Sequence, residues 1–286
     1  LNLKVEAGME EYRQETNSFY GVTTYYSKVG GSGSTVPGTP STNYNDVTRR
    51  RVRNTNTLSY DFKKLISNDN HHLNVLLGQE YIITEQRTFN TWVDGLPDFY
   101  TAEQAWAFMG AGSNASSSNM NYAADDILLS YFGRVNYDFD NTFLFTGSIR
   151  YEGNTKFGTD HKWGAFPAAS AAWRVSRLSF FEDSQTVNDL KLRFSYGQTG
   201  RSGFDKYISL AKYTGYGWMP NSEGKWVQVY GPGNNPNKDL SWEKQISYNL
   251  GIDYTLFNSR LSGSLDLFIR EGKDVIGEYQ VPVPPY

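Results

Sequence analysis

Adjacent carboxylates are the first residues in this sequence that could carry out acid and base chemistry. They occur at Glu10-Glu11, Asp125-Asp126 and Glu182-Asp183. Neighbouring side chains on a strand point to opposite faces, so the two members of such a pair cannot share one substrate as acid and base. We therefore expect no enzymatic activity from these residues.

Metal and cofactor chemistry is equally poorly supported. The three histidines, His71, His72 and His161, lack the partners and the spacing of a metal site. The sequence has no cysteine, which excludes thiol catalysis, a disulfide scaffold and Cys-based zinc sites. We expect no metal and no cofactor.

Aromatic side chains in two long polar segments are the best candidates for contact with a ligand. Sugar rings stack on aromatic faces while their hydroxyls meet carboxylates and amides, and a peptide could lie along the same surface. The alternative is that these rings pack the loops together or contact another protein, because aromatics are common at interfaces. The candidates are Trp92, Asp94, Phe99, Tyr100 and Trp106 in the first segment, and Tyr213, Tyr216, Trp218 and Trp226 in the second.

The elements that must position these residues are strands, because apolar and polar residues alternate with a period of two along the chain. One such run contains Phe143, Phe145, Gly147, Ile149 and Tyr151 on one face, with Thr142, Thr146, Ser148 and Arg150 on the other. We predict about nine strands of roughly 9 to 11 residues, the length that a tilted strand needs to cross a bilayer. They begin near Leu1, Val47, Leu73, Asp126, Thr142, Gly164, Asp189, Trp242 and Leu261.

The connections between these strands alternate in length. Tight or moderate connections are expected at 61–70, 138–141, 176–188 and 256–260, and long polar loops at 27–46, 88–124, 153–163 and 199–238. Outer-membrane barrels show this alternation, because their periplasmic turns are short and their extracellular loops are long. The pattern predicts an all-β, antiparallel, up-and-down transmembrane β-barrel.

Composition agrees with strands that face lipid on one side and water on the other. Aromatic residues make up 16% of the chain although the mean hydropathy is −0.57. No apolar run of about 18 residues is present, so a membrane-spanning helix is excluded. The net charge of −3 and a single basic run at 48–53 do not support nucleic-acid binding.

A soluble, carbohydrate-binding β-sandwich is the alternative fold, because its strands alternate too. The barrel explains better why a polar face lies opposite a uniform apolar band with aromatic ends. On this view lipid-facing residues include Ile149, Phe194 and Leu250, whereas Arg150 and Arg193 face the lumen. We assign Trp163, Trp173 and Trp242 to the aromatic girdle at the membrane boundary.

Several segments resemble the barrel of SusC/RagA-type, TonB-dependent transporters. They are YFGRVNYDFDNTFLFTGSIRYEGNTKFG from Tyr131, WGAFPAASAAWRVS from Trp163, NDLKLRFSYGQTG from Asn188 and NPNKDLSWEKQISYNLGIDYTLFNSRLSGSLDLFIREGKDVI from Asn235. Their order and spacing also resemble the family over residues 126–283. Residues 1–125 match only through strand-like stretches such as HHLNVLLGQEY.

The resemblance implies uptake of oligosaccharides or peptides across the bacterial outer membrane. It implies a barrel of about 22 strands in outer-membrane lipid, an N-terminal plug that contacts the TonB complex, and a SusD-like surface lipoprotein as lid. We expect residues 1–286 to be one partial barrel domain that lacks the plug and the closing strands. Both ends, Leu1 inside an alternating segment and the proline-rich run 281–286, are expected to interrupt a longer chain.

Overall fold

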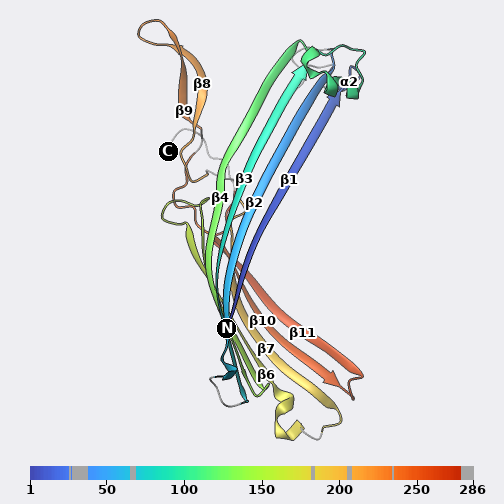
Figure 1. Ribbon diagram of the computed structural model, residues 1–286, viewed down its shortest axis with the longest axis vertical. Helices are drawn as coiled ribbons and strands as arrows, with labels where there is room; N and C mark the ends of the chain where they lie inside the picture. Colours follow the sequence, from blue (N-terminus) through green and yellow to red (C-terminus); the bar gives the residue numbers. More distant parts are fainter. Residues whose placement is uncertain are drawn as a thin grey trace. The chain divides into compact units, whose positions relative to one another are not determined.

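The computed structural model describes residues 1–25, 27, 38–64, 69–181, 184–204, 208–233 and 235–277, and only the backbone of residues 64 and 114–125. Within them, strands dominate (Figure 1). The helical elements are α2 (Ala102–Ala107) and four short 3-10 turns: η1 (Phe62–Lys64), η2 (Met109–Ala111), η3 (Val175–Arg177) and η4 (Ser179–Phe181). The strands are β1 (Asn2–Tyr20), β2 (Ser41–Asp61), β3 (His71–Asp94), β4 (Asn114–Phe139), β5 (Phe143–Asn154), β6 (Trp163–Arg174), β7 (Val187–Arg201), β8 (Tyr213–Pro220), β9 (Trp226–Pro232), β10 (Glu243–Leu256) and β11 (Leu261–Lys273).

Nine of these strands form one sheet in the order of the sequence, β1-β2-β3-β4-β5-β6-β7-β10-β11. Among the strands of the described residues, β8 and β9 alone lie outside this sheet, and they pair with each other in a separate two-stranded sheet. Up-and-down order in a single sheet confirms the predicted fold class and overturns the β-sandwich alternative, which needs two sheets packed face to face. The hairpin of β8 and β9 was not predicted.

The chain divides into two compact units. Unit 1 comprises residues 1–7, 53–82 and 126–286, and unit 2 comprises residues 8–52 and 83–125. Strands β1 to β4 contribute to both units, whereas β5 to β11 belong to unit 1 alone. The residues of the two long aromatic segments therefore fall into different units.

Four strands are much longer than the predicted 9 to 11 residues. β1, β2, β3 and β4 contain 19, 21, 24 and 26 residues. At about 3.4 Å per residue, a strand of 24 residues extends about 80 Å, whereas the hydrocarbon core of a bilayer is about 30 Å thick. Much of each long strand must therefore extend beyond the membrane, and the predicted loop 88–124 shrinks to the segment between Asp94 and Asn114.

The turn between β4 and β5 is the tightest connection in the sheet. Asp140 and Asn141 both have positive φ, and Thr142 N–H donates to the Phe139 carbonyl at 2.9 Å. Two central residues with positive φ are typical of a type I′ turn, whose twist matches that of the flanking strands. Asp138 Oδ1 accepts a hydrogen bond from the Asn141 N–H at 2.8 Å, which fixes the turn further.

The remaining connections follow the predicted alternation of length with one exception. The connection from β6 to β7 (175–186), expected to be moderate, is longer than the one from β5 to β6 (155–162), expected to be long. Its additional residues form η3 and η4. Backbone groups there bond locally, as when Leu178 N–H donates to Val175 at 3.0 Å.

The pairing of β6 with β7 is incomplete, and an apolar cluster lies beside the gap. β6 pairs with β5 along nearly its whole length, but with β7 only from Ala168 to Arg174. Pro167, which has no N–H to donate, is the first residue beyond this ladder. The cluster is made of Phe157, Phe166, Leu240 and Trp242.

Unit 2 has its own small core. Val93, Leu96 and Ala105 are buried together, with Phe19, Tyr100 and Met109 packed against them. Helix α2 begins at a capping box, in which Thr101 and Gln104 bond reciprocally to each other's backbone N–H groups. The core and the cap hold the segment between β3 and β4 in a defined conformation.

Candidate functional site

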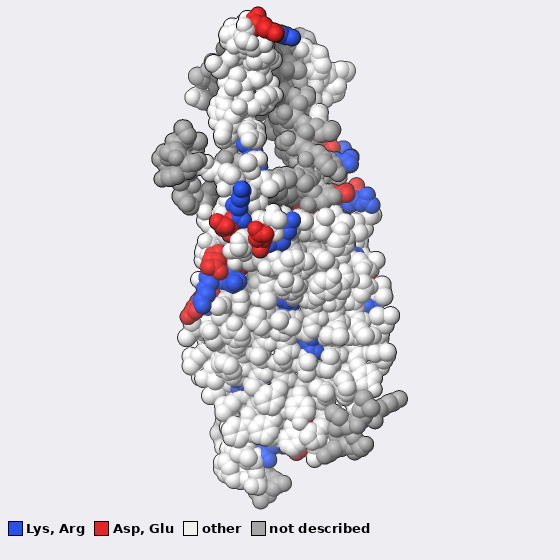
Figure 2. All heavy atoms as spheres, turned by 90° about the vertical axis from the view of Figure 1, so that its left-hand side faces the viewer, with Lys and Arg blue, Asp and Glu red and all other residues white. Residues whose placement is uncertain are grey.

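The outward face of unit 1 is an apolar band. Along β5, exposed residues alternate with less exposed ones. Phe143, Phe145, Gly147, Ile149 and Tyr151 are exposed, and the residues between them are partly buried. Figure 2 shows a broad surface on which charged side chains are few and scattered. The other outward positions with large exposed apolar side chains include Tyr131, Leu192, Phe194, Leu250, Leu265 and Leu267.

Trp163 and Trp173 mark two edges of this band. Both lie on β6, and their positions are ten residues apart, so they share one face. At about 3.4 Å per residue and a tilt of about 40°, their separation along the membrane normal is about 25 Å, the usual height of the apolar band of a barrel. The geometry therefore supports the predicted girdle role of these two residues.

Each of the two rings stacks on aromatic side chains from other strands. Trp163 stacks on Tyr151 with ring centroids 4.8 Å apart and on Tyr131 at 6.5 Å. Trp173 stacks on Phe143 at 6.1 Å. On neighbouring strands Tyr137 stacks on Phe145 at 6.4 Å, and its hydroxyl shares a 2.7 Å hydrogen bond with His71 Nδ1.

Trp242 does not fit the girdle to which we assigned it. Its side chain is only 3% exposed, and its ring packs against Phe157 at 4.5 Å and Phe166 at 5.3 Å. Its Nε1–H donates to the Lys162 carbonyl at 2.9 Å. A ring enclosed by protein on all sides has no surface for lipid, so we correct this assignment: Trp242 anchors the segment before β10 to the loop before β6.

The inner face of unit 1 carries ion pairs, one of which reaches across β4 from β5 to β3. Arg150 Nη2 on β5 donates to Glu80 Oε1 on β3 at 2.7 Å, and Arg150 Nε also pairs with Glu152. Thr55 on β2 donates to the second oxygen of Glu80 at 3.0 Å. The guanidinium of Arg150 lies 5.5 Å from the ring of Phe132. These groups satisfy one another, as charges on a polar lumen face should.

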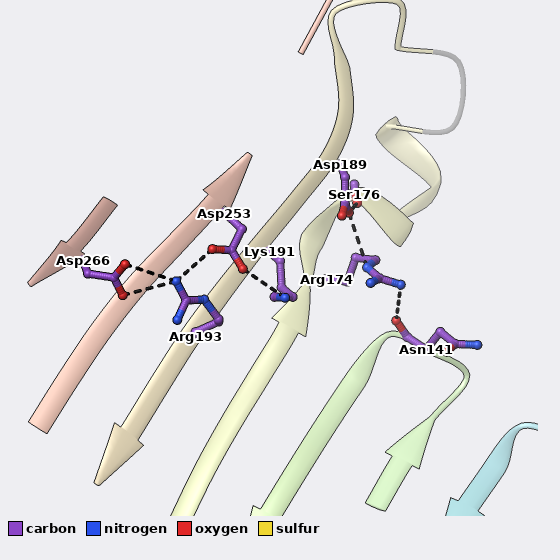
Figure 3. A network of polar contacts seen from close by, with 8 residues as sticks. All are labelled: Asn141, Arg174, Ser176, Asp189, Lys191, Arg193, Asp253 and Asp266. Carbon is purple, nitrogen blue, oxygen red and sulfur yellow. Dashed lines mark hydrogen bonds and ion pairs between the residues drawn. The ribbon is translucent and has the colours of Figure 1, made fainter. Parts of the chain in front are cut away.

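A second network joins β7, β10 and β11 (Figure 3). Arg193 Nη2 donates to Asp253 at 2.8 Å and to Asp266 at 3.2 Å, and Lys191 contacts the other oxygen of Asp253 at 3.0 Å. Gly251 lies between these groups: a Cβ there would be 2.7 Å from Asp266 Oδ1 and 2.8 Å from Arg193 Nη2. The glycine therefore gives the guanidinium room to reach across β10.

The hairpin of β8 and β9 presents most of the second group of predicted aromatics. Directly opposed residues of an antiparallel pair share a face, and the pairs Tyr213↔Pro232, Trp218↔Gln228 and Pro220↔Trp226 all lie on one side. A bulge at Gly215/Gly217 places Tyr216 on the opposite side, where its ring covers Gly231 and its hydroxyl donates to the Pro232 carbonyl at 2.7 Å.

Sequence reasoning missed one member of this face. Tyr230 pairs with Gly215 and shares the side of Trp218 and Trp226. The alternation of Trp226, Gln228 and Tyr230 is the signal that could have found it. We call the side with Tyr213, Trp218, Trp226 and Tyr230 the ring face, and all four side chains are well exposed, with Trp218 and Trp226 at 62% and 63%.

The first group of predicted residues lies in unit 2, where some of their side chains are packed against other residues and others are exposed. Trp92 stacks on Tyr20 with centroids 5.4 Å apart, Asp94 is fully buried, and Tyr100 packs against the core of Val93, Leu96 and Ala105. Phe99 and Trp106 are exposed, at 75% and 37%. Of the five residues of this group, only Phe99 and Trp106 therefore present their rings to solvent.

The described residues offer little for catalysis. Among them, no group of three or more His, Cys, Asp or Glu side chains could hold a metal ion. No helix in the described part of the chain is long and apolar enough to cross a membrane. Glu182 and Asp183 lie outside the described residues, and the side chain of Asp125 is also not described.

A single up-and-down sheet with an apolar outer face and a charged inner face is the wall of a transmembrane β-barrel. A sequence model of the family described as "TonB dependent receptor-like, beta-barrel" matches residues 6–286. The chain therefore belongs to this family of outer-membrane transporters. Family membership confirms the predicted location, and it confirms that the chain is not an enzyme.

The relatives and solved structures most informative here are of the SusC and RagA kind. The TonB-dependent receptor SusC of Bacteroides thetaiotaomicron is 33% identical over 169 residues, which are 57% of this chain and 16% of SusC. The TonB-dependent receptor P3 of Formosa agariphila is 30% identical over 237 residues, 81% of this chain and 22% of P3. A structure of the RagAB peptide transporter matches with a TM-score of 0.80 and 25% identity, over 98% of this chain and 29% of the RagAB chain. This chain thus spans about a fifth of the length of its curated relatives.

Proposed function

We propose that these residues form part of a TonB-dependent importer that carries oligosaccharides or peptides across the outer membrane. The observation that carries the proposal is the outward apolar band between Trp163 and Trp173, opposite an inner face lined by paired charges. Such a wall separates lipid from a polar lumen. The SusC and RagAB relatives support import as the activity of the whole protein.

The proposal includes further parts of the barrel. In the sheet of the described residues, β1 and β11 each have only one neighbour. Unpaired strand edges are unfavourable in lipid, because their backbone N–H and C=O groups find no water to bond to. We propose that both edges pair with other strands of a larger barrel. We also propose that a plug domain, which contacts TonB, fills this barrel.

We propose that exposed loop rings contact the cargo or a SusD-like surface lipoprotein. Support comes from the exposure of Phe99 and Trp106 in unit 2 and of the ring face in unit 1. Trp92, Asp94 and Tyr100 would act indirectly, since contacts within unit 2 already occupy much of their surface. Tyr216 would position the hairpin through its bond to Pro232.

Growth and uptake experiments test the proposed import. The gene is deleted in its host, and the strain is grown on single glycans or peptides as the sole carbon source. We expect one class of nutrient to stop supporting growth, with growth restored by the wild-type gene. The same loss after deletion of tonB, with simple sugars still used, would show energy coupling.

Two results would contradict the proposal. Growth on every nutrient could be unchanged by the deletion although the gene is expressed, or uptake could be independent of TonB.

Partnership with a lipoprotein is tested separately, by purifying the tagged full-length protein in detergent and identifying what remains bound. A SusD-like lipoprotein in equal amount is the expected result, and its absence removes this partner from the proposal.

A further inference from the structure

The ring face of the β8–β9 hairpin carries no charge. Its members are aromatic, proline, glycine and one amide side chain. The only charged residues of the whole hairpin are Glu223 and Lys225, in the tip between the two strands. A ligand that lies along this face therefore meets neither a salt-bridge partner nor a repelling charge. The eight residues of the face are Tyr213, Gly215, Trp218, Pro220, Trp226, Gln228, Tyr230 and Pro232.

The rings on this face form a regular series. Successive paired positions hold one ring each, with Trp226 opposite Pro220, Trp218 opposite Gln228, Tyr230 opposite Gly215 and Tyr213 opposite Pro232. The rings thus come alternately from β9 and β8. Same-face positions on a strand are two residues apart, so the rings step by about 7 Å and span about 20 Å.

An amide lies between the second and third rings. Gln228 folds across Gly215, where its Nε2 is 2.7 Å from the position that a Cβ would take. The Tyr230 hydroxyl donates to Gln228 Oε1 at 3.0 Å, which fixes the orientation of the amide. Its N–H groups can therefore donate to a hydroxyl held over the neighbouring rings.

The hairpin keeps these groups in place without a hydrophobic core of its own. In its tip, the Asn221 side chain accepts from the N–H groups of Glu223 and Lys225 at 3.0 and 2.9 Å. At its base, Gly233 N–H donates to the Lys212 carbonyl at 2.7 Å. A two-stranded hairpin alone is marginally stable, so coverage of the exposed rings would stabilise it.

We propose that the ring face binds a neutral, linear oligosaccharide along its length. This proposal rests on the import function proposed above and specifies the cargo of that function. Sugar rings present flat C–H faces that stack on aromatic rings, and their hydroxyls suit the Gln228 amide and the indole N–H groups. A peptide that adds to a strand edge binds through backbone hydrogen bonds, which a face of rings does not offer. An acidic glycan would need cations that this face lacks.

The test is calorimetry on the full-length protein in detergent, with maltoheptaose, cellohexaose and xylohexaose as probes. We expect at least one to bind, with an affinity that increases with chain length until the ligand spans about 20 Å. Trp218→Ala and Trp226→Ala should each weaken binding by about 2- to 12-fold, the effect of one aromatic stack. The control is Met219→Ala with Val227→Ala, a cross-strand pair on the opposite face, which should change affinity by less than about 2-fold.

The outcomes separate this inference from the proposed function. Uptake of a neutral glycan with unchanged affinity in both tryptophan variants would overturn the ring-face site and leave import intact. Loss of a bound lipoprotein in those variants, without loss of glycan affinity, would identify the face as a protein contact and would also overturn the inference. Circular dichroism at the tryptophan bands checks that the hairpin of each variant remains folded. An equal loss of affinity in the control pair, with these bands unchanged, would show that binding does not depend on the ring face and would overturn the inference.

Discussion

At Gly251 the absence of a side chain allows three charged groups from three strands to meet on the inner face. The guanidinium of Arg193 occupies the space in which a Cβ would lie, between Asp253 and Asp266. Gly147, on β5, has nothing within 4 Å of its Cβ position. A side chain at position 251 would therefore displace the charged groups, whereas a side chain at position 147 would meet no neighbouring atom.

This difference predicts opposite results for the same substitution. Gly251→Ala should displace Arg193 from Asp266 and lower the free energy of unfolding by about 1 kcal/mol, the upper range for a partly exposed ion pair. Gly147→Ala should be neutral or stabilise by about 0.4 to 1 kcal/mol through the unfolded state. Urea unfolding of the full-length protein in detergent measures both, and equal effects would show that Gly251 has no role in the network.

Trp242 and Trp226 show that residue type alone does not assign a tryptophan its role. We assigned Trp242 to the girdle from the sequence, but this residue precedes the first residue of β10, Glu243, so the strand does not fix the direction of its side chain. Its burial against Phe157 depends on a contact between residues far apart in sequence, which no local pattern reveals.

The two tryptophans should respond differently to truncation. Trp242→Ala leaves a cavity beside Phe157 and Phe166 and loses the bond to Lys162, so we expect a loss of about 3 to 5 kcal/mol. Trp226→Ala, at an exposed position, should change stability by less than about 0.5 kcal/mol. Limited proteolysis of the loops at 155–162 and 202–242 provides the readout. Faster cleavage in Trp226→Ala than in Trp242→Ala would contradict the buried position of Trp242 and the exposed position of Trp226.

Among the elements, the β4–β5 hairpin was the easiest to predict. Its alternation is regular, and the sequence Asp138 to Asn141 contains residues that tolerate positive φ. Asn141→Gly should therefore keep or improve stability, whereas Asn141→Val should cost about 1 to 2 kcal/mol because a β-branched residue is strained there. Urea unfolding of the full-length protein in detergent measures the effect, and equal stabilities of the two variants would argue against the left-handed turn.

The lengths of β3 and β4 and the β8–β9 hairpin could not be predicted as well. Residues 114–125 are rich in Ser and Asn and resemble a loop, yet they are extended as part of β4, next to β3. Pairing to a neighbouring strand outweighs the weak preference of such residues for turns. The sequence does carry a signal for the hairpin, because two aromatic runs flank the turn residues Asn221 and Gly224.

At the scale of the molecule, the sequence predicted the sheet order and the two faces because both follow from the period of two. It could not predict the division into two units or which loop rings remain exposed, since both depend on packing between distant segments. We conclude that the face carrying Trp163, Ile149 and Trp173 contacts lipid while the opposite face does not.

Arginine substitutions at two adjacent positions of β6 test which face of the sheet contacts lipid. Ala169 lies on the outward face opposite Gly147, and Ser170 lies on the inward face opposite Thr146 and Ser195, both near the middle between Trp163 and Trp173. An outward arginine at mid-membrane costs about 2 to 4 kcal/mol, whereas a lumen position tolerates the charge. Amounts of folded, heat-modifiable protein in the outer-membrane fraction should therefore fall sharply for Ala169→Arg and stay near wild type for Ser170→Arg. Equal amounts of the two variants, or a greater loss for Ser170→Arg, would contradict the assignment of the faces.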